Sequence, residues 1–88
     1  MELAEAMRLK GACEWLREKP VTAEAWWQRS LKTAEEMGMR YQSGMTHLEM
    51  GRRLKDLEHL KQAEDIFTDI GAEWDLAETR RLLERFQA

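Results

Sequence analysis

The 88-residue sequence predicts an all-α protein in which antiparallel helix-turn-helix units stack as a short solenoid of five helices. Two features of the sequence support this expectation. Apolar residues recur at the spacing of one helical face along most of the chain, and no segment alternates as a β-strand does. Two similar helix endings, Glu-Glu-Met-Gly and Thr-Asp-Ile-Gly, place Gly38 and Gly71 33 residues apart, a period typical of repeated helical pairs.

Four breaks between the expected helices follow from local chemistry. Pro20 ends the first helix, and Thr22 is the expected N-cap of the second. Gly38 and Gly71 can adopt the left-handed conformation that ends a helix, and Asp56 is the expected N-cap after a break at 51–55. The expected helices span about 2–18, 23–37, 39–52, 56–70 and 72–87.

Two apolar stripes predict the core. The stripe of the second helix consists of Ala23, Trp27, Ser30, Leu31, Ala34 and Met37, and that of the fourth consists of Leu57, Leu60, Ala63, Phe67 and Ile70. Residues at this spacing share one face of a helix, so these side chains are expected to pack inside.

A shift of 33 residues also aligns small residues with small ones. Gly11 falls on Gly44 and then on Ala77, and Ser30 falls on Ala63. The same shift places Trp27 on Leu60 and Ala34 on Phe67. A single helical pair cannot bury its own apolar face, so neighbouring pairs must stack. We therefore expect one domain, 1–88, with units over about 4–36 and 37–69 and half a unit over 70–88.

These features resemble the tetratricopeptide repeat family. In that family a small residue on the first helix of a unit lets the second helix approach closely, and the resemblance assigns this role to Gly11, Gly44 and Ala77. A small, bulky, small pattern marks the second helix. Ala23, Trp27 and Ser30 fit this pattern, and Leu60 and Ala63 fit its last two places. The closing proline of the family is missing, with Glu35 and Thr68 near its place.

A narrower likeness lies in Gly-Met-Arg-Tyr at 38–41 and in segment 57–83, which contains Ile-Gly-Ala-Glu-Trp-Asp-Leu-Ala. These stretches resemble the last helical repeats that follow the ATPase or cyclase modules of large bacterial signalling proteins and transcription regulators. The resemblance implies a bacterial signalling context, with this chain as a stand-alone relative or as a C-terminal piece of a longer protein.

Charge and composition exclude several classes of partner. A net charge of −3 argues against nucleic-acid binding, which needs a clustered excess of lysine and arginine. The single cysteine, Cys13, excludes an internal disulfide, fits a reducing compartment and is expected to pack as a small apolar residue. No apolar run approaches the roughly 20 residues that cross a bilayer. We therefore expect a soluble, cytoplasmic protein without a membrane partner.

No residue pattern predicts catalysis, a cofactor or a metal. Carboxylate pairs such as Glu14 and Glu18 are common on charged helices, and Cys13 has no base near it in sequence. His47 and His59 lie 12 residues apart and lack the i, i+4 partner of a helical metal site. We expect His47 to be partly buried and His59 to face water.

The remaining candidate is a surface for a protein partner. Family geometry implies that the first helix of each unit lines a concave side. The residues expected there are Arg8, Ala12, Trp15, Tyr41, Met45, Leu48, Trp74, Glu78 and Arg81. An aromatic and apolar set with a charged margin suits a partner helix or an extended peptide. In the alternative interpretation, Tyr41 and Trp74 only wedge between stacked helices.

The first helix is apolar on two sides, although no unit precedes it in the sequence. One side should therefore remain exposed and favour association. At most one of Trp26 and Trp27 can point inward. We expect a homodimer through the first two helices, with Leu3, Met7 and Trp26 at the interface.

The leading interpretation is a non-enzymatic protein–protein interaction scaffold that self-associates and holds a partner segment in its groove. The alternative is a regulatory domain that senses a small ligand. A closed apolar pocket lined by Trp15, Tyr41 and Trp74 would favour the sensor, and an open groove would favour the scaffold.

Overall fold

Five α-helices make up most of residues 3–87, the part of the chain that the computed structural model describes. They are α1 (Ala4–Leu16), α2 (Pro20–Glu36), α3 (Arg40–Leu54), α4 (Leu57–Ile70) and α5 (Glu73–Gln87). No strand occurs within residues 3–87. The predicted all-α fold class with five helices is confirmed.

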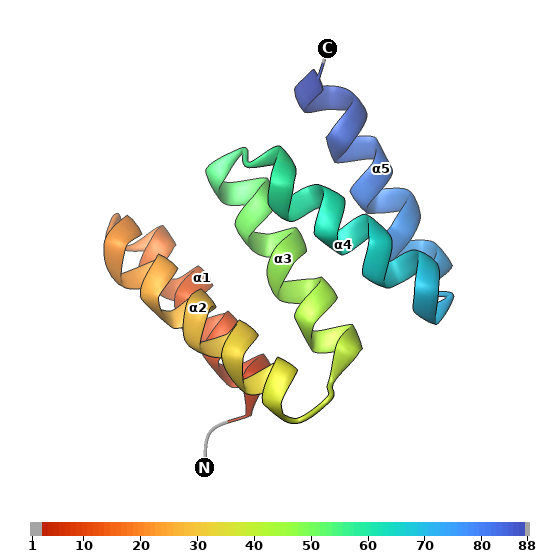
Figure 1. The fold of residues 1–88 in the computed structure, drawn as a ribbon. Helices are drawn as coiled ribbons and strands as arrows, with labels where there is room; N and C mark the ends of the chain where they lie inside the picture. The colour runs from red at the N-terminus through yellow and green to blue at the C-terminus, as the bar shows by residue number, and fades with distance from the viewer. Residues whose placement is uncertain (1–2, 88) are drawn as a thin grey trace.

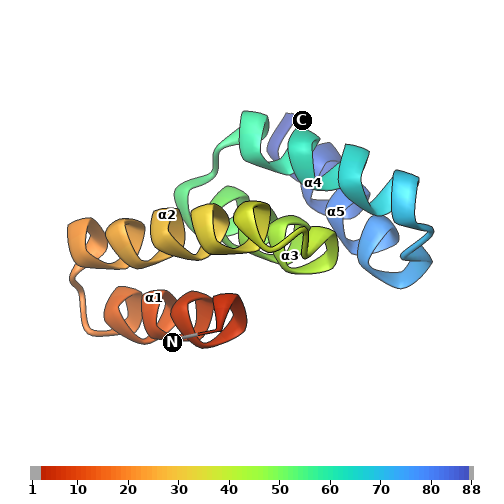
Figure 2. The same ribbon diagram turned by 60° about the horizontal axis from the view of Figure 1, so that its bottom comes forward.

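The helices pack in the order of the chain. α1 and α2 form one hairpin, α3 and α4 form a second, and α5 packs against α4 (Figure 1). α3 joins the two hairpins because it packs against α2 as well as α4. Figure 2 shows the α1–α2 hairpin at one end of the molecule and α4 and α5 at the other. This arrangement is the expected short stack of helical pairs rather than a bundle around one central core.

The four turns within residues 3–87 close in the same way. A residue in the left-handed conformation ends the helix, and the next N–H donates to the carbonyl five residues back, as in a Schellman motif. The left-handed residues are Glu18, Gly38, Lys55 and Gly71, and the bonds run from Lys19 to Glu14, Met39 to Ala34, Asp56 to Gly51 and Ala72 to Phe67. The two glycines were predicted. Glu18 and Lys55 were not, because this conformation costs an ordinary residue about 1–2 kcal/mol.

Two predicted helix boundaries are wrong. α2 begins at Pro20, because proline favours the helical φ and lacks the N–H that a first-turn residue would leave unbonded; Thr22 therefore lies inside the helix. α3 continues through Gly51 to Leu54, so Gly51 does not break it. The predicted cap at Asp56 is confirmed, since its carboxylate accepts hydrogen bonds from the N–H groups of residues 58 and 59.

Glycine lets the two helices of each hairpin cross closely. At Gly11 in α1, a side chain would collide with the indole of Trp27 in α2. At Gly44 in α3, a Cβ atom would lie 2.6 Å from Cε1 of Phe67 in α4. Both aromatic side chains are fully buried. Ala77 of α5 is the third equivalent residue, and it is exposed. Within the described residues, no further helix packs on α5 as α2 packs on α1.

The two hairpins fill the crossing from different positions of the second helix. Equivalent repeat positions are Trp27 and Leu60, and Ala34 and Phe67. The large residue is Trp27 in the first hairpin but Phe67 in the second, where the smaller Leu60 lies against Gly51 instead. The two hairpins thus place their aromatic residue at different positions of the repeat, which makes the repeat indistinct in the sequence.

α3 takes part in both hydrophobic clusters of the core. Its Met50 packs with Ala23, Trp27 and Leu31 of α2. Its Leu48 packs with residues of α4 and α5, namely Leu60, Ala63, Phe67, Leu82 and Leu83. Within the first hairpin, the Ser30 hydroxyl donates to the Ala4 carbonyl at 2.7 Å, and it lies 2.9 Å from the hydroxyl of Thr46 in α3. The central helix therefore connects the two units by apolar and polar contacts.

The repeat assignment predicts that the same substitution lowers stability at one position and leaves it almost unchanged at an equivalent one. Gly44→Leu places a bulky side chain where Phe67 already lies, and we expect it to lower the free energy of unfolding by about 3 kcal/mol, a large part of the stability of a small domain. Ala77→Leu meets open space and is expected to change stability by less than about 0.5 kcal/mol. Urea denaturation followed by circular dichroism measures both. Similar losses at the two positions would contradict the assignment.

Candidate partner-binding groove

A groove lies on the side of the molecule formed by the first helix of each unit. It encloses about 440 Å³ and is lined by Arg8, Met45, Leu48, Glu49, Arg52, Trp74, Asp75 and Glu78. These residues belong to α1, α3 and α5, and α2 and α4 contribute none of them. We call this site the α1–α3–α5 groove.

Five of the nine residues expected to bind a partner lie together in this groove. They are Arg8, Met45, Leu48, Trp74 and Glu78. Leu48 is largely buried and contributes mainly to the core, whereas Trp74 has 79% of its surface exposed. Trp74 therefore does not wedge between helices, and it offers an apolar surface to the groove.

The other four expected residues lie beside the groove or away from it. Arg81 pairs with Glu78 at the groove's edge. Tyr41 packs on Phe67, with ring centroids 6.0 Å apart. Trp15 packs on Trp27, with centroids 5.9 Å apart, and joins the core of the first hairpin. Ala12 is half-buried and, like Trp15, is not among the groove residues.

Three groove residues were not predicted: Glu49, Arg52 and Asp75. Helical spacing could have found Arg52, because it lies four residues after Leu48 on the same face of α3. Asp75 and Glu49 are both buried, and no local pattern predicts a buried carboxylate. Glu49 pairs with arginines three and four residues later, a spacing that the sequence shows, whereas the partner of Asp75 is the distant Tyr41.

The arginines around the groove are more exposed than the carboxylates that they bind. Glu49 has an 8% exposed side chain and pairs at 3.0 and 2.7 Å with Arg52 and Arg53, whose side chains are 43% and 31% exposed. Glu78 is 25% exposed and pairs at 2.7 Å with Arg81, which is 60% exposed. The hydrogen bond from Arg81 also lowers the pKa of Glu78. Both carboxylates therefore already have guanidinium partners within the chain.

Arg8 and Asp75 are the groove charges for which the described residues supply no salt bridge. Asp75 interacts with Tyr41: burial raises the pKa of the Tyr41 hydroxyl, and the charge of Asp75 and a hydrogen bond to its carboxylate raise it further. The Nε of Arg8 is buried and has no acceptor within residues 3–87. Of the two, Arg8 keeps unused hydrogen-bonding capacity.

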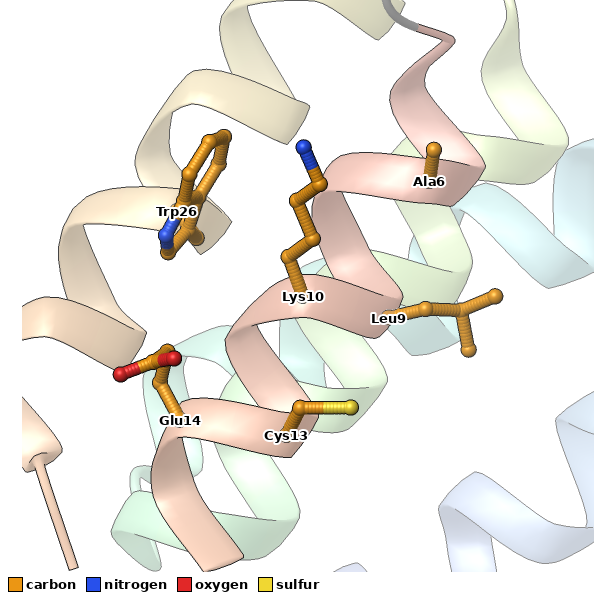
Figure 3. Close-up of a pocket in the computed structure, with 6 residues that line it drawn as sticks. All are labelled: Ala6, Leu9, Lys10, Cys13, Glu14 and Trp26. Carbon is orange, nitrogen blue, oxygen red and sulfur yellow. The ribbon is translucent and has the colours of Figure 1, made fainter. Parts of the chain in front are cut away.

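A second groove, of about 480 Å³, lies between α1 and α2 and is lined by Ala6, Leu9, Lys10, Cys13, Glu14 and Trp26. Figure 3 shows Lys10 beside Trp26, and Leu9 and Cys13 pointing away from the indole. Lys10 Nζ lies 4.7 Å and Arg29 Cζ 4.5 Å from the centroid of the Trp26 ring, in the range of cation–π contacts. Cys13 is exposed, contrary to the expectation that it packs inside.

The residues expected at a self-association interface differ in accessibility. Leu3 is exposed and Trp26 is partly exposed. Met7 is buried, and its sulfur accepts a hydrogen bond from Thr33 at 3.5 Å, so it offers little surface to a second copy. Leu9 and Leu16 are the exposed leucines of α1 itself. One side of this helix is therefore exposed, as its two apolar sides predicted.

His47 in α3 and His59 in α4 form a contact that was not predicted. Their Nδ1 atoms lie 2.9 Å apart, within hydrogen-bond distance. His59 is therefore partly buried, and the expectation that it faces water is wrong. The residues lie on either side of the turn at Lys55, where antiparallel helices bring them together. No third histidine, cysteine or carboxylate within residues 3–87 completes a metal-binding group with them.

No protein-family model, curated protein or solved structure matches this chain. The resemblance to the tetratricopeptide repeat family therefore remains a prediction. None of the helices in residues 3–87 combines the length and the apolar composition that crossing a membrane would require.

The histidine pair predicts that stability falls between pH 6.5 and 4. Burial lowers the pKa of His47 from 6.5 to about 4, and the neighbouring His59 contributes to the shift. In this window the unfolded chain binds a proton that the folded chain does not. As the pH falls through this window, the free energy of unfolding should therefore fall by about 1.4 kcal/mol per pH unit, or about 3 kcal/mol in total. Above pH 6.5 this contribution to stability is fully present.

Urea denaturation at a series of pH values measures this slope. Carboxylates also titrate near the lower limit, so His47→Gln is the control: without the imidazole, the slope between pH 6.5 and 5 should become shallower. An unchanged slope in His47→Gln would exclude His47 as its cause.

Proposed function

We propose that this protein is a non-enzymatic interaction scaffold of tetratricopeptide-repeat type that holds a segment of a partner protein in the α1–α3–α5 groove. The main support is that five of the nine residues that family geometry implied for the concave side come together from three helices in one groove. They lie on α1, α3 and α5, the helices that the resemblance assigns as the first of each unit.

The composition of the groove also supports a peptide site. Met45 and Trp74 supply apolar surface, while Arg8, Arg52 and Glu78 supply polar groups. An exposed tryptophan with polar groups around it is typical of residues that anchor an interface. An opening that extends over three helices suits an extended or helical segment.

The alternative is a sensor of a small ligand. A closed pocket lined by Trp15, Tyr41 and Trp74 would favour a sensor. Trp15 instead packs on Trp27 and Tyr41 on Phe67, and only Trp74 lines the groove. This separation of the three rings favours the scaffold.

We place the scaffold in the cytoplasm of a bacterium, as part of a signalling system. The support is the likeness of segments 38–41 and 57–83 to repeats of bacterial signalling proteins, together with the single cysteine and the stacked helical pairs. The proposal assigns no catalytic, cofactor or metal-binding role to any residue.

Self-association through the outer side of α1 is a further part of this proposal. Leu9 and Leu16 are exposed on α1, and Leu3 is exposed just before it. A helix that exposes leucines gains free energy by burying them against a second copy. Trp26 lies beside this surface and extends it to α2.

Replacing both exposed leucines of α1, Leu9→Glu with Leu16→Glu, is expected to give a monomer, because burying two carboxylates would oppose association. Light scattering across a dilution series measures the mass. Val21→Glu on α2, another exposed apolar position, is the matched control and should leave the mass unchanged. A wild-type chain that stays monomeric at high concentration would remove this part of the proposal.

The groove itself can be tested with a random twelve-residue peptide library displayed on phage and selected against the wild-type chain. We expect enriched peptides whose affinity, measured by fluorescence anisotropy, falls about 10-fold or more in Trp74→Ala, because an anchor tryptophan contributes at least about 1.4 kcal/mol. Trp26→Ala removes the same side chain outside the groove and should leave peptide affinity unchanged. Selection of no peptide, or equal affinity for Trp74→Ala, would contradict the proposed function.

A further inference from the structure

We propose that the α1–α3–α5 groove recognises a partner segment in which a carboxylate side chain stands beside a large apolar one, with Arg8 binding the carboxylate. This inference rests on the proposed function and adds the chemistry of the bound segment. It commits to an internal aspartate or glutamate of a protein, rather than to a basic peptide.

The charged residues of the groove differ in whether the chain already pairs them. Glu49 pairs with two arginines, and Glu78 pairs with Arg81. Asp75 is buried and interacts with Tyr41. Each carboxylate of the lining thus has a partner within the chain, whereas the Nε of Arg8 has no acceptor within residues 3–87. An aspartate or glutamate of the partner would supply the charge that Arg8 lacks.

Arg8 is the groove arginine that no carboxylate of the described residues binds. Arg52, Arg53 and Arg81 each donate to a carboxylate of the chain. By contrast, the buried Nε of Arg8 has no acceptor within residues 3–87. An unsatisfied buried donor is costly, and a guanidinium presents paired N–H groups that match the two oxygens of a carboxylate. A carboxylate from a partner would satisfy Arg8, provided that its side chain turns slightly toward the groove.

The apolar part of the groove indicates what should flank this carboxylate. Met45 of α3 and Trp74 of α5 line the same space as Arg8. The thioether of methionine adapts to different shapes, and an exposed indole offers a flat apolar surface. A leucine, phenylalanine or tryptophan next to the acidic residue would bury both surfaces. Affinity would then come from the apolar contact, and the choice of charge would come from Arg8.

The phage selection described above also tests this inference, because each displayed peptide is fused through its C-terminus and carries carboxylates only on side chains. We expect the enriched peptides to contain aspartate or glutamate next to a large apolar residue. One enriched peptide would then be synthesised with a C-terminal amide, together with a version in which glutamine or asparagine replaces the acid.

A double-mutant cycle connects the peptide carboxylate to Arg8. Arg8→Gln should weaken the acidic peptide about 10- to 100-fold, as expected for a charge-assisted hydrogen bond, and should have little effect on the amide version. Arg29→Gln, on α2 outside the groove, should change neither. Circular dichroism would verify that Arg8→Gln remains folded.

The outcomes separate the inference from the proposed function. Enriched peptides that are basic or neutral, or an Arg8→Gln variant that weakens acidic and amide peptides equally, would overturn the carboxylate preference while leaving the peptide groove intact. Selection of no peptide by the wild-type chain would overturn both.

Discussion

Close contact between an aromatic ring and bare helix backbone organises this fold. Because Gly11 and Gly44 have no side chain, Trp27 and Phe67 can lie directly on α1 and α3. Both rings are excluded from water, and burial of such large side chains is among the strongest contributions available to a domain of this size. The contact also determines the rotation of each first helix, since only the glycine face can turn toward the second helix.

The orientation of the first helices in turn creates the groove. With their glycine faces covered by α2 and α4, α1 and α3 present Arg8 and Met45 on another side, where α5 adds Trp74. Its carboxylates are less exposed than the arginines that bind them, because the long arginine side chains reach past the acids toward the solvent. The charges of the groove are therefore largely paired within the chain, and Arg8 is the exception among its arginines.

The helix boundaries show where local reasoning is sufficient and where it is not. Asp56, Gly38 and Gly71 were predicted at their turns because their side chains, or lack of them, favour those conformations directly. Lys55 and Glu18 take the same left-handed conformation without such a preference. There the packing of the antiparallel helices requires a tight turn and offsets the local cost.

Periodicity and capping residues identify five helices and most of their inward faces, because each of these depends on neighbours within a few turns, although Met37 and Ile70 at the ends of the two predicted stripes are exposed. The groove residues Arg8, Met45, Leu48, Trp74 and Glu78 were expected from the resemblance to the repeat family. Which faces of different helices meet is a separate matter, since the offset between two helices depends on the volumes of all side chains at their crossing. The exchange of Trp27 for Phe67 at the crossings, the contact of His47 with His59 and the burial of Asp75 beside Tyr41 all follow from those offsets. Residues distant in the chain become neighbours only when the helices pack, so no local pattern contains this information.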